Sequence, residues 1–258
     1  MSATTKSHWD AELYQKTAKT FQVKHALLWL EQLPLKDEDT ILDIGCGDGQ
    51  VTRNLARIAK NGYVDGIDIS SSMIATAKKT CHLSNLNFYV HDIEQASWTK
   101  KYDVLVSFFC IQWLSDKAKF FQNISKQLNK KGKIAFLFTN RNLSLLEARK
   151  QLIQKDNWAP FFKHYNDSTH VLDFNDYIGA AKSANLSNIQ LTKKMVSHDC
   201  SSRFEFEQFL QLISPALSYV KPELHEQFMG ELADIYLNEN GHTKYSIDYN
   251  FYYMTASL

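Results

Sequence analysis

The chain has 258 residues, 44% of them hydrophobic, and a formal net charge of +1. A chain of this length can bury a large core as one α/β domain. The near-neutral charge gives no bulk electrostatic reason to expect a nucleic-acid partner, because the phosphate backbone usually selects a basic protein face. No apolar run approaches the roughly 20 residues that cross a bilayer, so no membrane span is expected.

The cysteines and the polar amino terminus indicate a reducing compartment. Cys46, Cys81, Cys110 and Cys200 show no C-x-x-C spacing and no histidine partner at zinc spacing. We therefore expect neither disulfides nor a metal site. The first residues, MSATTKSHWD, contain no hydrophobic signal core. A cytoplasmic protein is the resulting expectation.

A glycine-rich turn follows the first apolar run of the chain. Residues 41–49 read ILDIGCGDG, which is typical of a buried parallel strand that ends in a turn. Gly45, Gly47 and Gly49 lack a Cβ, so a ligand can approach the backbone closely. A helix over Val51–Ala59 is expected next. A strand, a glycine turn and a helix in this order predict a nucleotide-like cofactor.

The spacing and the acids around this turn narrow the class of cofactor. A dinucleotide site uses G-x-G-x-x-G, whereas the spacing here is G-x-G-x-G. Asp43 and Asp48 would repel a pyrophosphate and favour a cationic ligand. S-adenosylmethionine carries an ammonium and a sulfonium and no phosphate. The segment resembles the first motif of class I S-adenosylmethionine-dependent methyltransferases, which has the form (D/E)-x-G-x-G-x-G.

Two further aspartates are placed where they can bind the ribose and the adenine of S-adenosylmethionine. A strand over Tyr63–Ile69 ends in Asp68, where a carboxylate can accept from both ribose hydroxyls. A strand over Asn87–Val90 precedes Asp92 and Ile93. The resemblance implies that Asp92 accepts a hydrogen bond from the adenine amine and that Ile93 covers the adenine ring. It implies cofactor contacts at Asp43, Gly45, Cys46, Gly47, Asp68, Ile69, Met73, Asp92, Ile93, Ser107 and Phe108, with Met73 on the helix that begins at Ser70 or Ser71.

The segment after the fourth strand, Tyr102–Phe108, indicates the methyl acceptor. Ligands lie beyond the carboxyl ends of strands in open α/β sheets, so the residues after Phe108 should face the reacting methyl. Residues 107–114 read SFFCIQWL and lack the proline that amino-methylating and C5-methylating nucleic-acid enzymes carry there. The run resembles juvenile hormone acid methyltransferases and, in its IQWL half, trans-aconitate methyltransferases. Both families methylate a carboxylate.

The amino-terminal segment resembles the opening helix of the same two families, which folds over cofactor and substrate. The resemblance implies that Gln22 and Trp113 hold the substrate carboxylate, with Tyr14 beside them. The spacing from Tyr14 to Gln22 is one residue longer than in the family, so Gln15 is the alternative to Gln22. An amphipathic helix that buries aromatic side chains would explain Tyr14 and Phe21 equally well.

The expected fold is an α/β, doubly wound, seven-stranded and mostly parallel sheet of the Rossmann-like methyltransferase type, with the last strand antiparallel and helical cap insertions. We expect one domain over residues 1–258, with a helical lid at 1–35, a cofactor-binding core at 36–140, and substrate-selecting caps at 142–172 and 203–240. The later elements expected are helices at 117–128, 143–154, 173–184, 203–213 and 222–237, and strands at 133–139, 189–196 and 243–256.

The sequence therefore predicts an S-adenosylmethionine-dependent methyltransferase that forms the methyl ester of a small carboxylic acid and releases S-adenosylhomocysteine. A carboxylate has a pKa of about 4 to 5 and needs no general base at neutral pH. Three alternatives stay open: a malonyl-carrier-protein O-methyltransferase of biotin synthesis, a protein or RNA methyltransferase, and a non-catalytic S-adenosylmethionine-binding protein. The oligomeric state is not predicted.

Overall fold

The structure is a computed structural model that describes residues 18–95, 98–140, 142–165, 174–239 and 244–258. The predicted site residue Tyr14 and its neighbour Gln15 lie outside these ranges. The chain divides into two compact units. Residues 22–140, 171–194 and 250–258 form one of them, which we call the sheet unit; residues 1–21, 141–170 and 195–249 form the other, which we call the helical unit.

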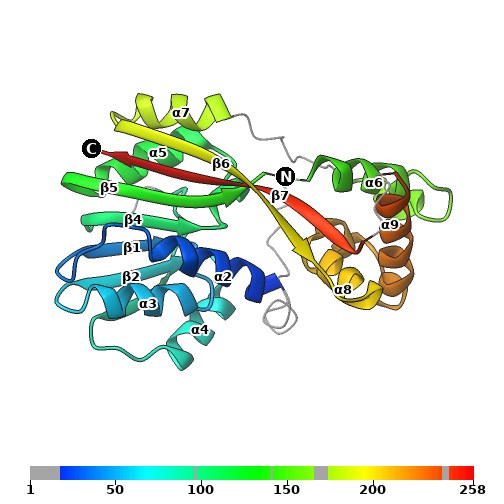
Figure 1. The fold of residues 1–258 in the computed structure, drawn as a ribbon, viewed down its shortest axis with the longest axis horizontal. Coiled ribbons are helices and arrows are strands. Elements are labelled where there is room, and N and C mark those ends of the chain that lie inside the picture. Colours follow the sequence, from blue (N-terminus) through cyan, green and yellow to red (C-terminus); the bar gives the residue numbers. More distant parts are fainter. Residues whose placement is uncertain (1–17, 96–97, 141, 166–173, 240–243) are drawn as a thin grey trace. The chain divides into compact units, whose positions relative to one another are not determined.

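The seven strands form one sheet in the order β3-β2-β1-β4-β5-β7-β6. Strand β7 runs antiparallel to β5, whereas β1 to β5 pair in parallel. The predicted mostly parallel sheet with an antiparallel last strand is confirmed (Figure 1). The strands are β1 (Thr40–Ile44), β2 (Tyr63–Asp68), β3 (Leu86–Val90), β4 (Tyr102–Phe108), β5 (Leu128–Thr139), β6 (Ser187–Asp199) and β7 (Ser246–Ser257).

Helices cover both faces of the sheet within the sheet unit (Figure 1). They are α2 (Ala18–Leu30), α3 (Gln50–Ile58), α4 (Ser71–Thr80), α5 (Lys117–Lys126) and α7 (Phe174–Ser183). Side chains of α5 and α7 share one hydrophobic cluster with the sheet, in which the rings of Phe138 and Tyr177 stack with centroids 4.6 Å apart. Ser70 and Asp116 cap α4 and α5 by accepting hydrogen bonds from main-chain N–H groups.

Strand β5 begins five residues earlier than predicted, and α5 ends two residues earlier. The sequence predicts a helix that ends at residue 128 and a strand that begins at residue 133, with Lys131 and Gly132 between them. In the structure Lys131 has φ 70°, and the pairing register with β4 shifts between Tyr102 and Val104. The two residues therefore form an irregularity inside a long strand, since a left-handed residue can extend one strand relative to its neighbour.

The helical unit has its own hydrophobic cluster, which includes Trp158, Phe206 and Phe228. Its elements are α6 (Leu143–Ile153), α8 (Arg203–Ile213), α9 (His225–Glu239) and three 3₁₀ turns at η2 (Ala159–Phe162), η3 (Pro215–Tyr219) and η4 (Pro222–Leu224). The helix predicted at 222–237 is thus a proline-started 3₁₀ turn followed by α9. None of the described helices is long and apolar enough to cross a membrane.

Two phenylalanines on α8 provide a matched test of this packing. Phe206 is fully buried, whereas Phe204 is 72% exposed. We expect Phe206→Ala to lower the free energy of unfolding by about 3–5 kcal/mol, because it leaves a cavity. Phe204→Ala should change it by no more than about 0.5 kcal/mol. Urea unfolding followed by circular dichroism measures both, and equal losses would contradict the described burial.

Candidate cofactor site and acceptor segment

The turn between β1 and α3 has three glycines with positive φ, at 73°, 54° and 81° for Gly45, Gly47 and Gly49. A Cβ at Gly45 would collide with the side chain of Cys110, and one at Gly49 would come within 2.6 Å of the Phe88 ring. A Cβ at Gly47 would meet nothing within 4 Å. The outer glycines are therefore required by packing, and the middle one leaves open space above the backbone.

The main-chain donors of this turn are already used inside the protein. The N–H groups of Gly45 and Cys46 both donate to the Ile67 carbonyl, at 2.8 and 3.0 Å. The N–H of Gly47 donates to Oδ2 of Asp68 at 2.9 Å. A phosphate-binding turn would leave such N–H groups for its ligand. The arrangement therefore favours a ligand without phosphate, as the sequence predicts.

Asp68 connects two turns at the carboxyl ends of neighbouring strands. Its Oδ2 accepts from Gly47, and its Oδ1 accepts from the main-chain N–H of Ser70 at 2.8 Å. Burial raises the pKa of Asp68, and these two hydrogen bonds oppose that shift. Each carboxylate oxygen has a second lone pair, so both can still accept from a ligand hydroxyl.

Asp43 is almost fully buried, with 1% of its surface exposed. Its Oδ2 accepts a hydrogen bond from the Thr52 hydroxyl of α3 at 2.7 Å. Burial raises the pKa of Asp43 to about 7; the Thr52 hydrogen bond lowers it and the charge of Asp68 raises it further. The Asp43 side chain is thus hydrogen-bonded to α3. Its predicted role is to supply negative charge near a cationic ligand from within the protein.

The apolar residues among the predicted cofactor contacts differ in exposure. Ile69 is 59% exposed, while Met73 and Ile93 are buried. Asp92 accepts a hydrogen bond on Oδ1 from the main-chain N–H of Glu94 at 3.0 Å. Cys46 is buried, and burial raises its pKa, so its thiol is neutral.

The segment after β4 combines a strained backbone with an exposed aromatic side chain. Phe109 has φ 55°, an uncommon conformation for a bulky residue and one that often marks a functional site. Its carbonyl accepts from Nε2 of Gln112 at 2.9 Å. The short turn η1 (Ile111–Trp113) presents Trp113, which is 50% exposed.

The remaining predicted residues have structural contacts of their own. The Ser107 hydroxyl is buried and donates to the Ile44 carbonyl at 2.8 Å, so it joins β4 to β1. Phe108 packs edge-on against Trp29 of α2, with centroids 6.0 Å apart. Gln22 is half-buried near the start of the same helix. The roles of these residues toward cofactor or substrate stay predictions.

Two further polar side chains belong to this region, and Gln112 is one of the residues expected to face the reacting methyl. Oε1 of Gln112 is buried and has no hydrogen-bond partner among the described residues. The ring of His25 lies 5.1 Å from that of Phe251, which in turn contacts Phe109. Gln112 stands beside Trp113 in the IQWL motif, so that motif was the available signal; nothing in the sequence separates His25 from other helix residues.

Comparison with known proteins decides the family. The family model described as a methyltransferase domain matches residues 35–202. The chain belongs to this methyltransferase family. It is 31% identical over 246 residues to protein 235L of Invertebrate iridescent virus 6, which carries a methyltransferase name, and the match covers 95% of this chain and 92% of that protein.

Two groups of carboxyl methyltransferases are among the relatives. Juvenile hormone acid O-methyltransferase of Bombyx mori is 24% identical over 88% of this chain and 85% of its own length. Malonyl-[acyl-carrier protein] O-methyltransferase 1 of Ilyobacter polytropus is 34% identical over 57% of this chain and 56% of its own length. The family resemblance stated from the motifs is therefore confirmed.

Solved structures show the same fold. Phosphoethanolamine N-methyltransferase 2 of Haemonchus contortus, in complex with S-adenosyl-L-methionine, aligns with a TM-score of 0.55 at 18% identity, covering 91% of this chain and 52% of that one. The protein is an S-adenosylmethionine-dependent methyltransferase. The open space at Gly47 and the unused lone pairs of Asp68 fit this cofactor.

The buried carboxyl of Asp43 makes stability depend on pH. Its pKa is raised from 3.8 to about 7 in the folded methyltransferase, so stability is lost as pH rises from about 4 to about 7. A difference of this size corresponds to at most about 4 kcal/mol. Asp43→Asn cannot ionise, and its melting temperature relative to wild type should rise from pH 5 to pH 8. A difference that is the same at both pH values would contradict the raised pKa.

Asp68 offers a direct test of cofactor binding. We expect Asp68→Ala to weaken the binding of S-adenosylhomocysteine by about 100-fold or more, because both turns lose their acceptor and the ligand hydroxyls lose theirs. Asp68→Asn keeps one oxygen acceptor and should lie between the alanine variant and wild type. Isothermal titration calorimetry measures the dissociation constants, with circular dichroism as the folding control. Unchanged affinity in Asp68→Ala would remove this residue from the site.

Proposed function

We propose that this methyltransferase transfers the methyl group to a carboxylate of a small organic acid. The observation that carries the proposal is the segment 107–114 after β4, which contains an exposed Trp113 and no general base. The titratable side chain in that segment is Cys110, and burial raises its pKa to about 12. A carboxylate is ionised at neutral pH and needs no base, whereas a hydroxyl or an ammonium does.

Methyl transfer requires the protein mainly to position the acceptor oxygen relative to the methyl group. When bound, S-adenosylmethionine supplies a methyl group that the sulfonium already activates. The protein then has to hold the acceptor oxygen in line with that carbon, and such orientation can supply most of the rate enhancement. In this proposal the Gln22 amide and the Trp113 indole N–H donate hydrogen bonds to the acceptor carboxylate. The names of the juvenile hormone acid and malonyl-carrier-protein relatives support a carboxyl acceptor.

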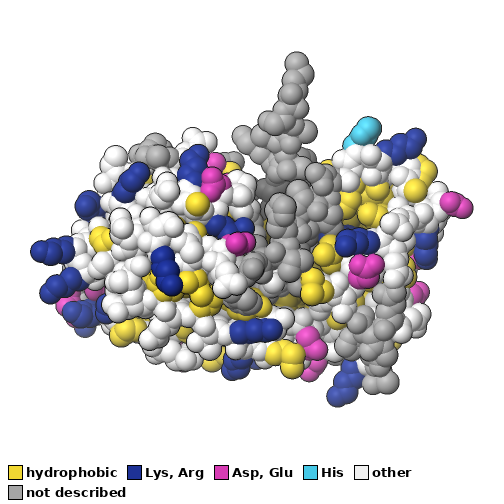
Figure 2. Space-filling model, turned by 90° about the horizontal axis from the view of Figure 1, so that it is seen from above, with side chains coloured by type: hydrophobic (Ala, Val, Ile, Leu, Met, Phe, Trp, Pro, Cys, Tyr) yellow, Lys and Arg dark blue, Asp and Glu magenta, His cyan; other side chains and the backbone are white. Residues whose placement is uncertain are grey.

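The free carboxylate of a malonyl thioester on a carrier protein is the second candidate for the acceptor. It rests on relatives of the malonyl-carrier-protein group, which cover about half of this chain. An acidic carrier would need a basic docking face. Figure 2 shows Lys and Arg side chains on the visible face, several of them near one another at its left end and others scattered among Asp and Glu side chains.

We further infer that the enzyme works in a reducing compartment such as the cytoplasm, on a small molecule and not on nucleic acid. The four cysteines are all free thiols. Free buried thiols are typical of proteins that are not exported to oxidising surroundings. The formal charge of +1 supports a small-molecule acceptor, because nucleic-acid enzymes usually carry a strongly basic face.

The class of acceptor can be tested with methyl-labelled S-adenosylmethionine and a panel of carboxylic acids, amines and alcohols. We expect label in a product that mild base releases, since an ester hydrolyses and an N-methyl group does not. Malonyl carrier protein is included in the panel, and labelling of that substrate alone would support the second candidate. Base-stable label would contradict carboxyl methylation altogether.

Trp113 should affect turnover and leave cofactor binding intact. Trp113→Ala is expected to lower kcat/KM for the acid by about 10- to 100-fold, because the acceptor loses an orienting donor. Its dissociation constant for S-adenosylhomocysteine should stay within about twofold of wild type. Trp113→Phe keeps a ring and loses the N–H, so it isolates the hydrogen bond. Full activity in both variants would exclude Trp113 from acceptor binding.

A further inference from the structure

The connection between β3 and β4, residues 91–101, differs from the other parallel connections of the sheet. Helices α3, α4 and α5 lie in the connections from β1 to β2, β2 to β3 and β4 to β5. Parallel strands are usually joined through such a helix. The described part of residues 91–101 contains none. This connection carries Asp92 and Ile93, so side-chain contacts must position the predicted adenine contacts.

Glu94 makes the most concentrated of these contacts. Its Oε1 accepts from the Ser115 main-chain N–H at 2.9 Å, from the Ser115 hydroxyl at 2.7 Å and from the Asp116 main-chain N–H at 2.9 Å. Hydrogen bonds to a carboxylate are stronger than neutral ones. One oxygen thus holds the residues that lie between Trp113 and the first turn of α5.

A second contact joins the residues around Glu94 to helix α5. Asn123 of α5 is buried, and its Nδ2 donates to the carbonyls of Ile93 and Glu94 at 3.5 and 3.4 Å. Asp116 caps the helix that carries Asn123. Asn123 and the two residues before α5 therefore all donate hydrogen bonds to residues 93 and 94.

We propose that Glu94 is a positioning residue that couples the predicted adenine contacts, Asp92 and Ile93, to the acceptor segment that follows β4. The Asp92 carboxylate, the predicted partner of the adenine amine, accepts from the main-chain N–H of Glu94, and the side chain of Glu94 then holds Ser115 and Asp116. A ligand that fixes Asp92 also fixes the residues next to Trp113. The cofactor thereby orders the acceptor segment before the acceptor arrives. The proposal rests on the proposed roles of Asp92 and Trp113.

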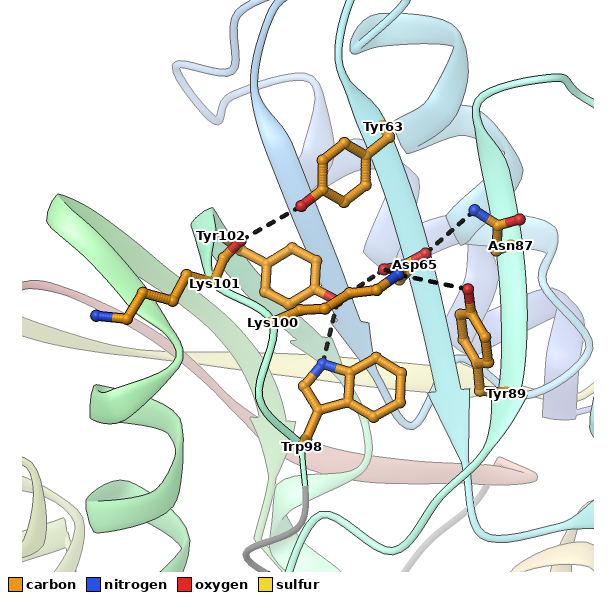
Figure 3. Close-up of polar contacts among 8 residues, drawn as sticks. All are labelled: Tyr63, Asp65, Asn87, Tyr89, Trp98, Lys100, Lys101 and Tyr102. Carbon is orange, nitrogen blue, oxygen red and sulfur yellow. Dashed lines mark hydrogen bonds and ion pairs between the residues drawn. The ribbon is translucent and has the colours of Figure 1, made fainter.

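The far end of the same connection has a separate anchor, which provides a control. Nζ of Lys100 lies 2.8 Å from Oδ2 of the buried Asp65, which also accepts from the Tyr102 hydroxyl at 2.7 Å (Figure 3). Nε1 of Trp98 donates to the same hydroxyl at 3.1 Å. Figure 3 shows Lys100, Trp98 and Tyr102 gathered beside Asp65 of β2. This anchor holds the connection through β2 and β4, so loosening it should not interrupt the path through Glu94.

Amide hydrogen exchange with and without S-adenosylhomocysteine tests the coupling directly, because two of the three donors to Glu94 are main-chain amides. In wild type we expect the ligand to slow exchange at Ser115 and Asp116 by about fivefold or more. In Glu94→Ala the slowing should fall below about twofold, while protection of the glycine turn at 45–47 persists. Glu94→Gln retains an acceptor oxygen and should restore much of the effect, and Lys100→Gln should respond as wild type does.

Two results would overturn the proposal: no ligand-dependent slowing at Ser115 and Asp116 in wild type, or the same slowing in Glu94→Ala as in wild type. If Glu94→Ala does not fold, Glu94→Asp replaces it, because the shorter side chain should not span the same distance and should show the same loss. The measurement uses no methyl acceptor. Its failure is therefore distinguishable from failure of the carboxylate proposal, which the labelled-product assay tests.

Discussion

The bonds made by the Asp68 carboxylate are the constraint on which the cofactor site depends. One oxygen holds the glycine turn after β1 through the Gly47 N–H, and the other holds the turn after β2 through the Ser70 N–H. Because β1 and β2 are parallel neighbours, their turns meet at the same edge of the sheet, and a single side chain can set the distance between them. The Ile67 carbonyl completes this arrangement by accepting from Gly45 and Cys46. Hydrogen bonds within the protein therefore define the shape of the turn.

The same region keeps carboxyl groups where water is largely excluded. Burial raises the pKa of both Asp43 and Asp68, and the charge of Asp68 adds to the shift at Asp43. Burying a carboxylate costs stability, and the hydrogen bonds that Asp43 and Asp68 accept offset that cost in part. The two carboxyl groups fit a cofactor that carries an ammonium and a sulfonium and can act as the missing counter-charge. Stability and function oppose each other at this site, which is common where a ligand completes the electrostatics.

Much of the core follows from the sequence, because its signals are local. The glycine spacing, the acid at the end of β2 and the apolar strands all rest on steric rules that hold whatever surrounds them. The prediction was wrong at the start of β5, which is at Leu128 and not at residue 133, because Lys131 and Gly132 form an irregularity within the strand opposite β4. That outcome is decided by pairing with another strand, which no local pattern records. Glu94 was missed for the same reason: its side chain joins segments far apart in the chain, since it accepts hydrogen bonds from Ser115 and Asp116.

Each of the two compact units has a hydrophobic cluster drawn from its own residues. The cluster of the helical unit is built on aromatic side chains such as Trp158, Phe206 and Phe228, and that of the sheet unit on Tyr102, Phe120 and Phe138. A substitution that reshapes one cluster is compensated among neighbours in the same unit, because packing energies act over contact distances. The core of either unit can therefore be remodelled by substitutions within that unit alone.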